Sequence, residues 1–82
     1  MLSAIATAVA LMRDANPQTE EMCMMCVSLD GPSLRWVKNQ TPEICMAAVK
    51  QDGGALVYVK NQTPNICKAA IKNDALAIIY VK

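Results

Sequence analysis

The chain has no histidine and no phenylalanine, and its only aromatic residues are Trp36, Tyr58 and Tyr80. Because histidine is the commonest general base and the commonest metal ligand, its absence removes the usual routes to acid–base catalysis and metal binding. The net charge is only +1, so no overall attraction draws the chain to nucleic acid or to an anionic membrane. We therefore expect no enzyme, cofactor, metal, nucleic-acid partner or small-molecule substrate.

Long apolar runs are also scarce, and the only candidate is residues 1–12, MLSAIATAVALM. This run lacks a basic segment before it, and Arg13, Asp14 and Asn16 follow where a signal peptide has small residues. It is too short to span a bilayer. The pattern favours a buried helix over a targeting segment, and we expect no membrane partner.

What the chain does have is a tandem repeat with a period of 22 residues. Residues 40–61 read QTPEICMAAVKQDGGALVYVKN, residues 62–82 read QTPNICKAAIKNDALAIIYVK, and residues 18–39 form a looser copy. Residues 1–17 are interpreted as a degenerate partial repeat. Self-similarity at a fixed period is typical of stacked repeat architectures, so we expect all four segments to form one domain.

Each copy predicts two short helices. Thr41 suits a helix N-cap and Pro42 the first helical position, so a helix is expected over residues 42–51. We expect this helix to stop at Asp52-Gly53, where glycine marks its end, and a second helix to follow over residues 54–60. The predicted fold is all-α, a short α-solenoid of 22-residue helical hairpins. The second segments are rich in β-branched residues, so a helix-plus-strand solenoid is the alternative.

Comparison of the copies predicts the core. Positions that stay apolar or small in all three copies should form one continuous core, with each repeat burying its face on the next. Positions that accept lysine in one copy should face solvent. The predicted core columns are Met22/Ile44/Ile66, Cys23/Cys45/Cys67, Cys26/Ala48/Ala70, Val27/Val49/Ile71, Leu34/Leu56/Ile78 and Val37/Val59/Val81.

Cys23 and Cys26 form a C-x-x-C motif. A zinc site would need a second pair of ligands, and a redox motif would need a strand and a βαβ context, so neither is expected. Cys45 and Cys67 recur at the position of Cys23, which favours small buried residues in a reducing, intracellular setting.

One aspartate recurs in each copy, as Asp30, Asp52 and Asp74. A calcium loop needs several oxygen ligands close together, whereas these carboxylates come once per repeat at the junction of the two helices. We interpret them as helix caps.

Positions at which the copies disagree are the candidate binding residues. Met24 and Met46 stand where the last copy has Lys68, so at least half of each methionine side chain is expected to be exposed. Val57 and Ile79 stand where the first copy has arginine. These four apolar side chains are possible partner-binding residues, because adaptable apolar patches are used for recognition. The alternative is that they lie flat against neighbouring helices.

The last segment, ALAIIYVK, is the most apolar of the second segments. A solenoid needs polar ends to stay soluble. We therefore expect another protein subunit to cover the C-terminal end, or else the chain to be part of a longer array.

The motif QTPEICMAAVKQDG, followed after Gly54 by ALVYVKNQTP, resembles the repeat family called domain of unknown function 4116. The resemblance is close over residues 40–82, looser over 18–39 and faint before that. It implies short helical hairpins, no catalytic residues, and an origin in large DNA viruses of amoebae or in some bacteria. It further suggests a scaffold or interaction module, such as a small structural component of a virus particle. A regulator that binds a host protein is the alternative.

Overall fold

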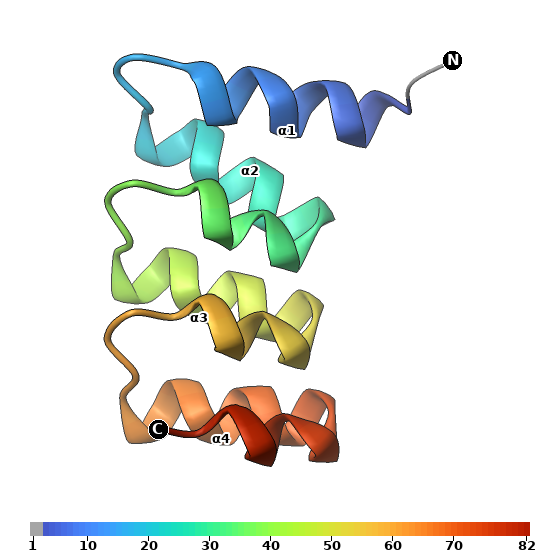
Figure 1. The fold of residues 1–82 in the computed structure, drawn as a ribbon, viewed down its shortest axis with the longest axis vertical. Coiled ribbons are helices and arrows are strands. Elements are labelled where there is room, and N and C mark those ends of the chain that lie inside the picture. Colours follow the sequence, from blue (N-terminus) through green and yellow to red (C-terminus); the bar gives the residue numbers. More distant parts are fainter. Residues whose placement is uncertain (1–2) are drawn as a thin grey trace.

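The computed structural model describes residues 3–82. In chain order its elements are α1 (Ala4–Asp14), α2 (Glu20–Leu29), η1 (Gly31–Trp36), α3 (Pro42–Gln51), η2 (Gly53–Tyr58), α4 (Pro64–Asn73) and η3 (Ala75–Tyr80), where η is a 3-10 helix. Within these residues there is no strand, so the all-α prediction is confirmed and the helix-plus-strand alternative is wrong. The helices stack along one axis in a slab of 33 × 26 × 16 Å (Figure 1).

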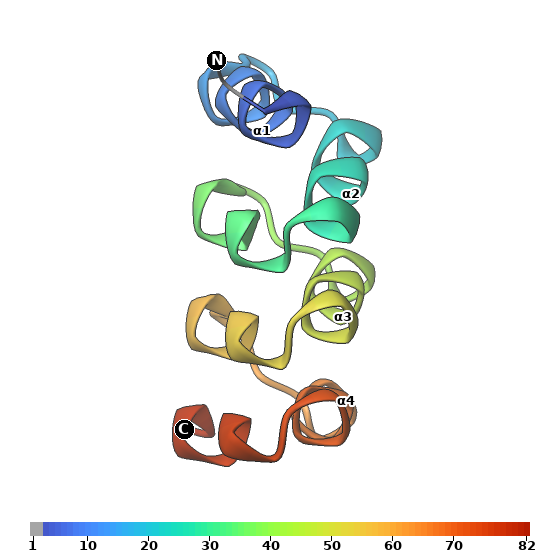
Figure 2. The same cartoon turned by 90° about the vertical axis from the view of Figure 1, so that its right-hand side faces the viewer.

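The stack has two columns (Figure 2). The helices α2, α3 and α4 form one column, and α1 stands above the three 3-10 helices in the other. Successive α-helices pack on one another, and α3 and α4 also pack on the 3-10 helices before and after them. This arrangement buries one face of every repeat on its neighbour, as expected for a solenoid. None of these helices combines the length and apolar character needed to cross a bilayer.

The start of each repeat is fixed by a threonine. The hydroxyl oxygens of Thr19, Thr41 and Thr63 each accept a hydrogen bond of 3.2–3.3 Å from the backbone N–H three residues later. These bonds satisfy donors that a helix N-terminus otherwise leaves free. The predicted N-caps are therefore confirmed in all three repeats.

The second helix of each repeat differs from the prediction. It is a 3-10 helix of six residues, and in the second repeat it spans Gly53–Tyr58 rather than an α-helix over residues 54–60. The backbone N–H of Val59 closes the last turn by donating to the carbonyl of Leu56, three residues back. At the other end, the Asp52 side chain accepts from the N–H of Gly54. With only six residues between these ends, the tighter 3-10 geometry is adopted.

The aspartate caps recur with one exception. Asp74 accepts from the N–H of Leu76 just as Asp52 does from Gly54, which confirms the capping role for both. Asp30 makes no such bond, because the equivalent position is Pro32, which has no N–H to donate.

The predicted helix end at Asp52-Gly53 is confirmed, since α3 ends at Gln51 and Asp52 is its C-cap. None of the glycines has a positive φ angle, so none forms a left-handed C-cap. Gly31 and Gly53 are required by close approach instead. A Cβ atom on Gly53 would lie 2.4 Å from the carbonyl oxygen of Ala70, and one on Gly31 would lie 2.5 Å from that of Ala48. Glycine is therefore the residue that allows each repeat to sit this near the next α-helix.

The predicted core columns are confirmed in the interior of the array. Leu34, Leu56 and Val59 are fully buried, as are most of their column mates. The last repeat departs from the prediction, since Ile78 is 62% exposed and Val81 is 43% exposed. In the structure no further repeat covers these side chains, so they are exposed to solvent.

The N-terminal helix α1 is mostly exposed, so the predicted buried helix is wrong except for Met12, which is completely buried. Met12 takes the place that Leu34 and Leu56 hold in later repeats. The Gln18 side chain donates to the carbonyl of Met12 at 2.9 Å, the bond that the later glutamines make to Leu34 and Leu56. The last turn of α1 thus stands where a 3-10 helix stands elsewhere. Met1 and Leu2 of the predicted partial repeat lie outside the described residues.

A ladder of recurring glutamines, one per repeat, links the start of each repeat to its end on the loop side. The amide nitrogen of Gln40 donates to the carbonyl of Tyr58 at 2.8 Å, and its oxygen accepts from the N–H of Lys60 at 3.0 Å and from the Cys45 thiol. Gln18 and Gln62 repeat this pattern. The recurring cysteines therefore lie beside a polar partner, with Cys23 and Cys45 buried and Cys67 partly exposed, a role that the sequence comparison missed.

Candidate interaction surface

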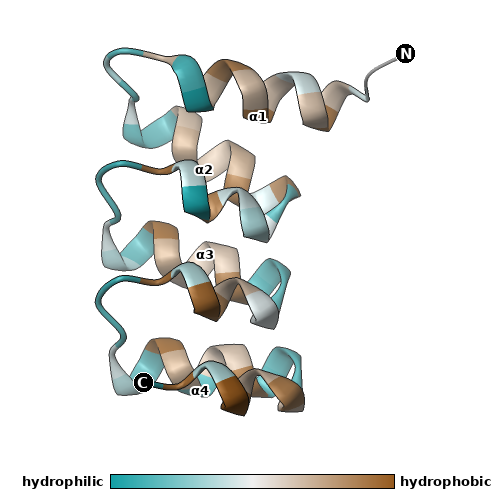
Figure 3. Ribbon diagram, in the orientation of Figure 1, coloured by the Kyte–Doolittle hydropathy of each residue, from teal (hydrophilic) through white to brown (hydrophobic). Residues whose placement is uncertain are grey.

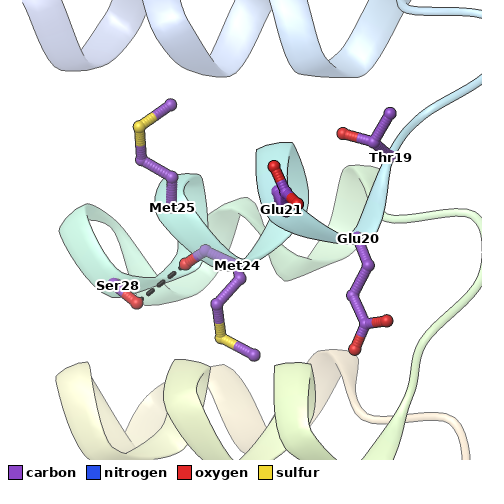
Figure 4. Close-up of a pocket in the computed structure, with 6 residues that line it drawn as sticks. All are labelled: Thr19, Glu20, Glu21, Met24, Met25 and Ser28. Atoms are coloured by element: carbon purple, nitrogen blue, oxygen red, sulfur yellow. Dashed lines mark hydrogen bonds between the residues drawn. The ribbon is translucent and has the colours of Figure 1, made fainter.

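The outer side of the α-helix column carries a groove. It lies along α2, with a volume of about 720 Å³, and is lined by Thr19, Glu20, Glu21, Met24, Met25 and Ser28 (Figure 4). A shallower groove of about 490 Å³ occupies the equivalent positions of α3. Because the same positions line both grooves, the surface is a product of the repeat.

Met24 and Met46 do lie in these grooves, as predicted for a variable stripe. The expectation that at least half of each side chain is exposed is wrong, because both are only partly exposed and pack against the core. Met25, which is 57% exposed, is the accessible methionine, and it points to the opposite side of α2 from Met24 (Figure 4). Its signal in the sequence was a large side chain where the later copies have alanine.

Charge changes sign along this surface. The first turn of α2 carries Glu20 and Glu21, and its last turn has no basic residue. The order is reversed in α4, which has no acidic residue in its first turn and carries Lys72 in its last. The exposed Lys68 adds to the positive end. The stack therefore has an acidic N-terminal end and a basic C-terminal end.

The outer side of the other column changes from cationic to apolar. The Arg35 guanidinium lies 4.8 Å from the centre of the Trp36 ring and 5.9 Å from that of Tyr58, within cation–π range. One repeat further on, Val57 takes the place of arginine and is 40% exposed. In the last repeat Ile79 takes it and is 71% exposed, so for Ile79 the alternative of lying flat against a neighbour is wrong.

The end of the array beyond α4 is an open apolar surface, which we call the C-terminal face and define as Ile71, Leu76, Ile78 and Val81. Leu76 is 72% exposed and Ile78 is 62% exposed. The apolar character of η3 at this end is plain in Figure 3. Sequence comparison identified the apolar segment, but only the stack shows which of its side chains are uncovered.

Three of the four cysteines lie in a setting that lowers their chemical reactivity. Cys23, Cys26 and Cys45 are buried free thiols, and burial raises the pKa of each above its ordinary value. Neighbouring groups add to this, since Cys26 and Glu20 raise the pKa of Cys23 further and Asp30 that of Cys26. Within residues 3–82 no three cysteine, aspartate or glutamate side chains gather as a metal site would require. These thiols fit a packing role.

A scan against family models, a search of curated proteins and a search of solved structures each found no match to this chain. Function is therefore inferred from the surfaces described above.

Proposed function

We propose that this protein is a non-enzymatic helical-repeat scaffold that binds other protein subunits through its exposed apolar side chains. The observation that carries the proposal is the C-terminal face. Ile78 is 62% exposed, whereas Leu34 and Leu56 at the same position are completely buried. Apolar surface gains roughly 25 cal/mol per Å² when it leaves water, so a partner that covers this face is favoured. Large exposed apolar patches on soluble proteins commonly mark interaction sites.

The polar side chains support the same proposal. The recurring glutamine, threonine and aspartate residues are engaged with the backbone of their own array, as Gln40, Thr41 and Asp52 illustrate. Such residues build a scaffold and are not gathered around a cavity with perturbed acids and bases, the arrangement that catalysis requires. Buried free thiols fit a reducing, intracellular setting. The family resemblance supports a small structural component of a large-virus particle, wedged between larger subunits.

The test is affinity capture from cells that make the protein, comparing the natural chain with a variant of the C-terminal face. Leu76→Lys combined with Ile78→Lys changes two exposed side chains and should leave the fold intact, which circular dichroism checks. Asn39→Lys with Asn61→Lys is the matched control, because it adds the same charge on exposed loop positions. The expected result is a defined set of proteins retained by the natural chain and the control and lost by the face variant. Retention of the same set by all three would contradict the proposal, and so would a tightly bound small molecule seen by native mass spectrometry in place of a protein.

A further inference from the structure

Both ends of the array expose apolar side chains. At the N-terminal end α1 covers α2 only in part, and Met25 and Leu29 of α2 are 57% and 49% exposed. We define the N-terminal face as Met22, Met25 and Leu29. At the other end lies the C-terminal face, defined above. Each face is the uncovered half of a contact that is filled in the interior, where successive α-helices pack directly on one another.

The same two ends lose the polar clamp that joins interior repeats. The N–H of Gly31 donates to the Gln51 side chain at 2.6 Å, and the N–H of Gly53 donates to the Asn73 side chain at 2.7 Å. At the N-terminal face the position of Gln51 and Asn73 is taken by Leu29. At the C-terminal face Ala75 keeps the backbone N–H but carries a side chain where the interior repeats have Gly31 and Gly53, and Leu76 follows it.

The C-terminal face does not accept a further repeat in the interior geometry. A Cβ on Gly53 would lie 2.4 Å from a backbone carbonyl of the next α-helix, and Ala75 carries a Cβ at the equivalent position. A helix on this face must therefore sit farther out, or at another angle, than α4 sits on the second repeat. This geometry favours a separate molecule over a continuation in the same register.

The charges at the two ends of the array favour one particular partner for the C-terminal face. Residues 3–30 contain four acidic side chains and one basic side chain, a net charge of −3. Residues 62–82 contain three lysines and one aspartate, a net charge of +2. Two C-terminal ends brought together would place two positively charged segments against each other, whereas a C-terminal end on an N-terminal end would bring segments of opposite charge together. Electrostatic complementarity of this kind selects partner and orientation.

We propose that the C-terminal face binds the N-terminal face of a second copy of this chain, so that molecules associate head to tail. This inference rests on the proposed interaction role and names the partner. A head-to-tail contact uses two different surfaces, so each bound molecule offers a free face to the next, and open chains form unless the rotation closes a ring.

The first measurement is sedimentation velocity of residues 1–82 over a range of concentrations. The average mass should rise with concentration without stopping at a dimer, and high salt should weaken the association because it screens the charges. A chain that stays monomeric throughout, or that stops at a dimer, overturns the proposal.

Charge reversal then tests the orientation. Lys68→Glu with Lys72→Glu makes both ends acidic, and Glu20→Lys with Glu21→Lys makes both ends basic. Each variant alone should associate at least about tenfold more weakly than the natural chain. An equal mixture of the two variants should regain the association, because an acidic end can again meet a basic end. Lys38→Glu with Lys60→Glu is the matched control, since it changes the same charge at exposed loop positions and should associate like the natural chain.

Recovery in the mixture supports the head-to-tail contact. Equal association of the natural chain and both variants overturns it, as does a failure of the mixture to recover. The proposed scaffold role is tested separately by the capture experiment. A chain that stays monomeric but loses its captured proteins in the Leu76→Lys, Ile78→Lys variant would disprove self-association and leave the scaffold role standing.

Discussion

The backbone N–H of Gly53 donates a 2.7 Å hydrogen bond to the side-chain oxygen of Asn73, the last residue of the next α-helix. The Asn73 amide nitrogen in turn donates to the carbonyl of Lys50 at 3.0 Å. One side chain therefore satisfies a donor and an acceptor of the preceding repeat. The contact requires the glycine, because the backbone of α4 approaches too closely for a Cβ.

Gly53→Ala should destabilise the protein by about 1 to 3 kcal/mol, the usual range for forcing an extra methyl group into a packed site. The added Cβ would meet the Ala70 carbonyl, which belongs to a helix backbone and cannot rotate away. Urea unfolding measures the change in free energy. Gly54→Ala is the control, because its nearest neighbour is the Asp52 side chain at 3.2 Å, which can move. Equal losses in the two variants would contradict the close-approach explanation.

Gln40→Leu should cost about 2 kcal/mol, because it leaves the carbonyl of Tyr58 and the N–H of Lys60 without their partner. The thiol of Cys45 loses its acceptor as well. Thermal unfolding followed by circular dichroism measures the effect. Asn61→Leu, at an exposed loop position, serves as the comparison and should change stability little. A Gln40 variant as stable as the natural chain would show that the ladder contributes nothing net.

Ser33→Ala should stabilise the protein by about 1 kcal/mol. The Ser33 hydroxyl is buried and has no hydrogen-bond partner, and the later repeats have alanine at this position. A buried hydroxyl without a partner loses its hydrogen bonds to water and gains none within the protein. The reverse change, Ala55→Ser, should destabilise by a similar amount, since Ala55 is completely buried. Urea midpoints that move in the same direction for both variants would refute this reasoning.

At about pH 8, near the ordinary thiol pKa, Cys67 should react with a disulfide reagent well before the other cysteines. Cys67 is partly exposed, whereas burial raises the pKa of Cys23, Cys26 and Cys45 and so lowers their thiolate fraction. Mass spectrometry of quenched samples identifies the order of labelling. In concentrated guanidinium chloride all four should react together. Early labelling of Cys23 or Cys26 in the folded protein would argue against the packing role assigned to them.

Much of the fold could be predicted from the repeat. Thr41 and Pro42 placed the start of a helix correctly because capping depends on residues three positions apart. The columns that include Leu34 and Leu56 identified the core correctly, because a position that is apolar in every copy is expected to be buried. The type of the second helix could not be predicted, since short apolar runs do not distinguish an α-helix from a 3-10 helix or a strand.

The candidate surface was predicted less well than the core. Ile79 and Val57 are exposed as expected, but Met24 and Met46 are covered in part by packing against the core. Lys68 in the last copy indicated that this position faces solvent. The flexible side chains of Met24 and Met46 instead fold back along apolar surface. Exposure of a long side chain depends on which neighbours it can reach, and that information is spread over distant parts of the chain.

The 22-residue period, the helix starts and the interior core are already present in the order of the amino acids, because each depends on local spacing or on identity between copies. Only the tertiary structure decided why glycine stands at Gly31 and Gly53, what the glutamines bind, and which apolar residues of the last repeat are uncovered. The glutamine contacts within a repeat and the glycine contacts between repeats join residues about 20 positions apart, so they exist only once the chain has folded and stacked.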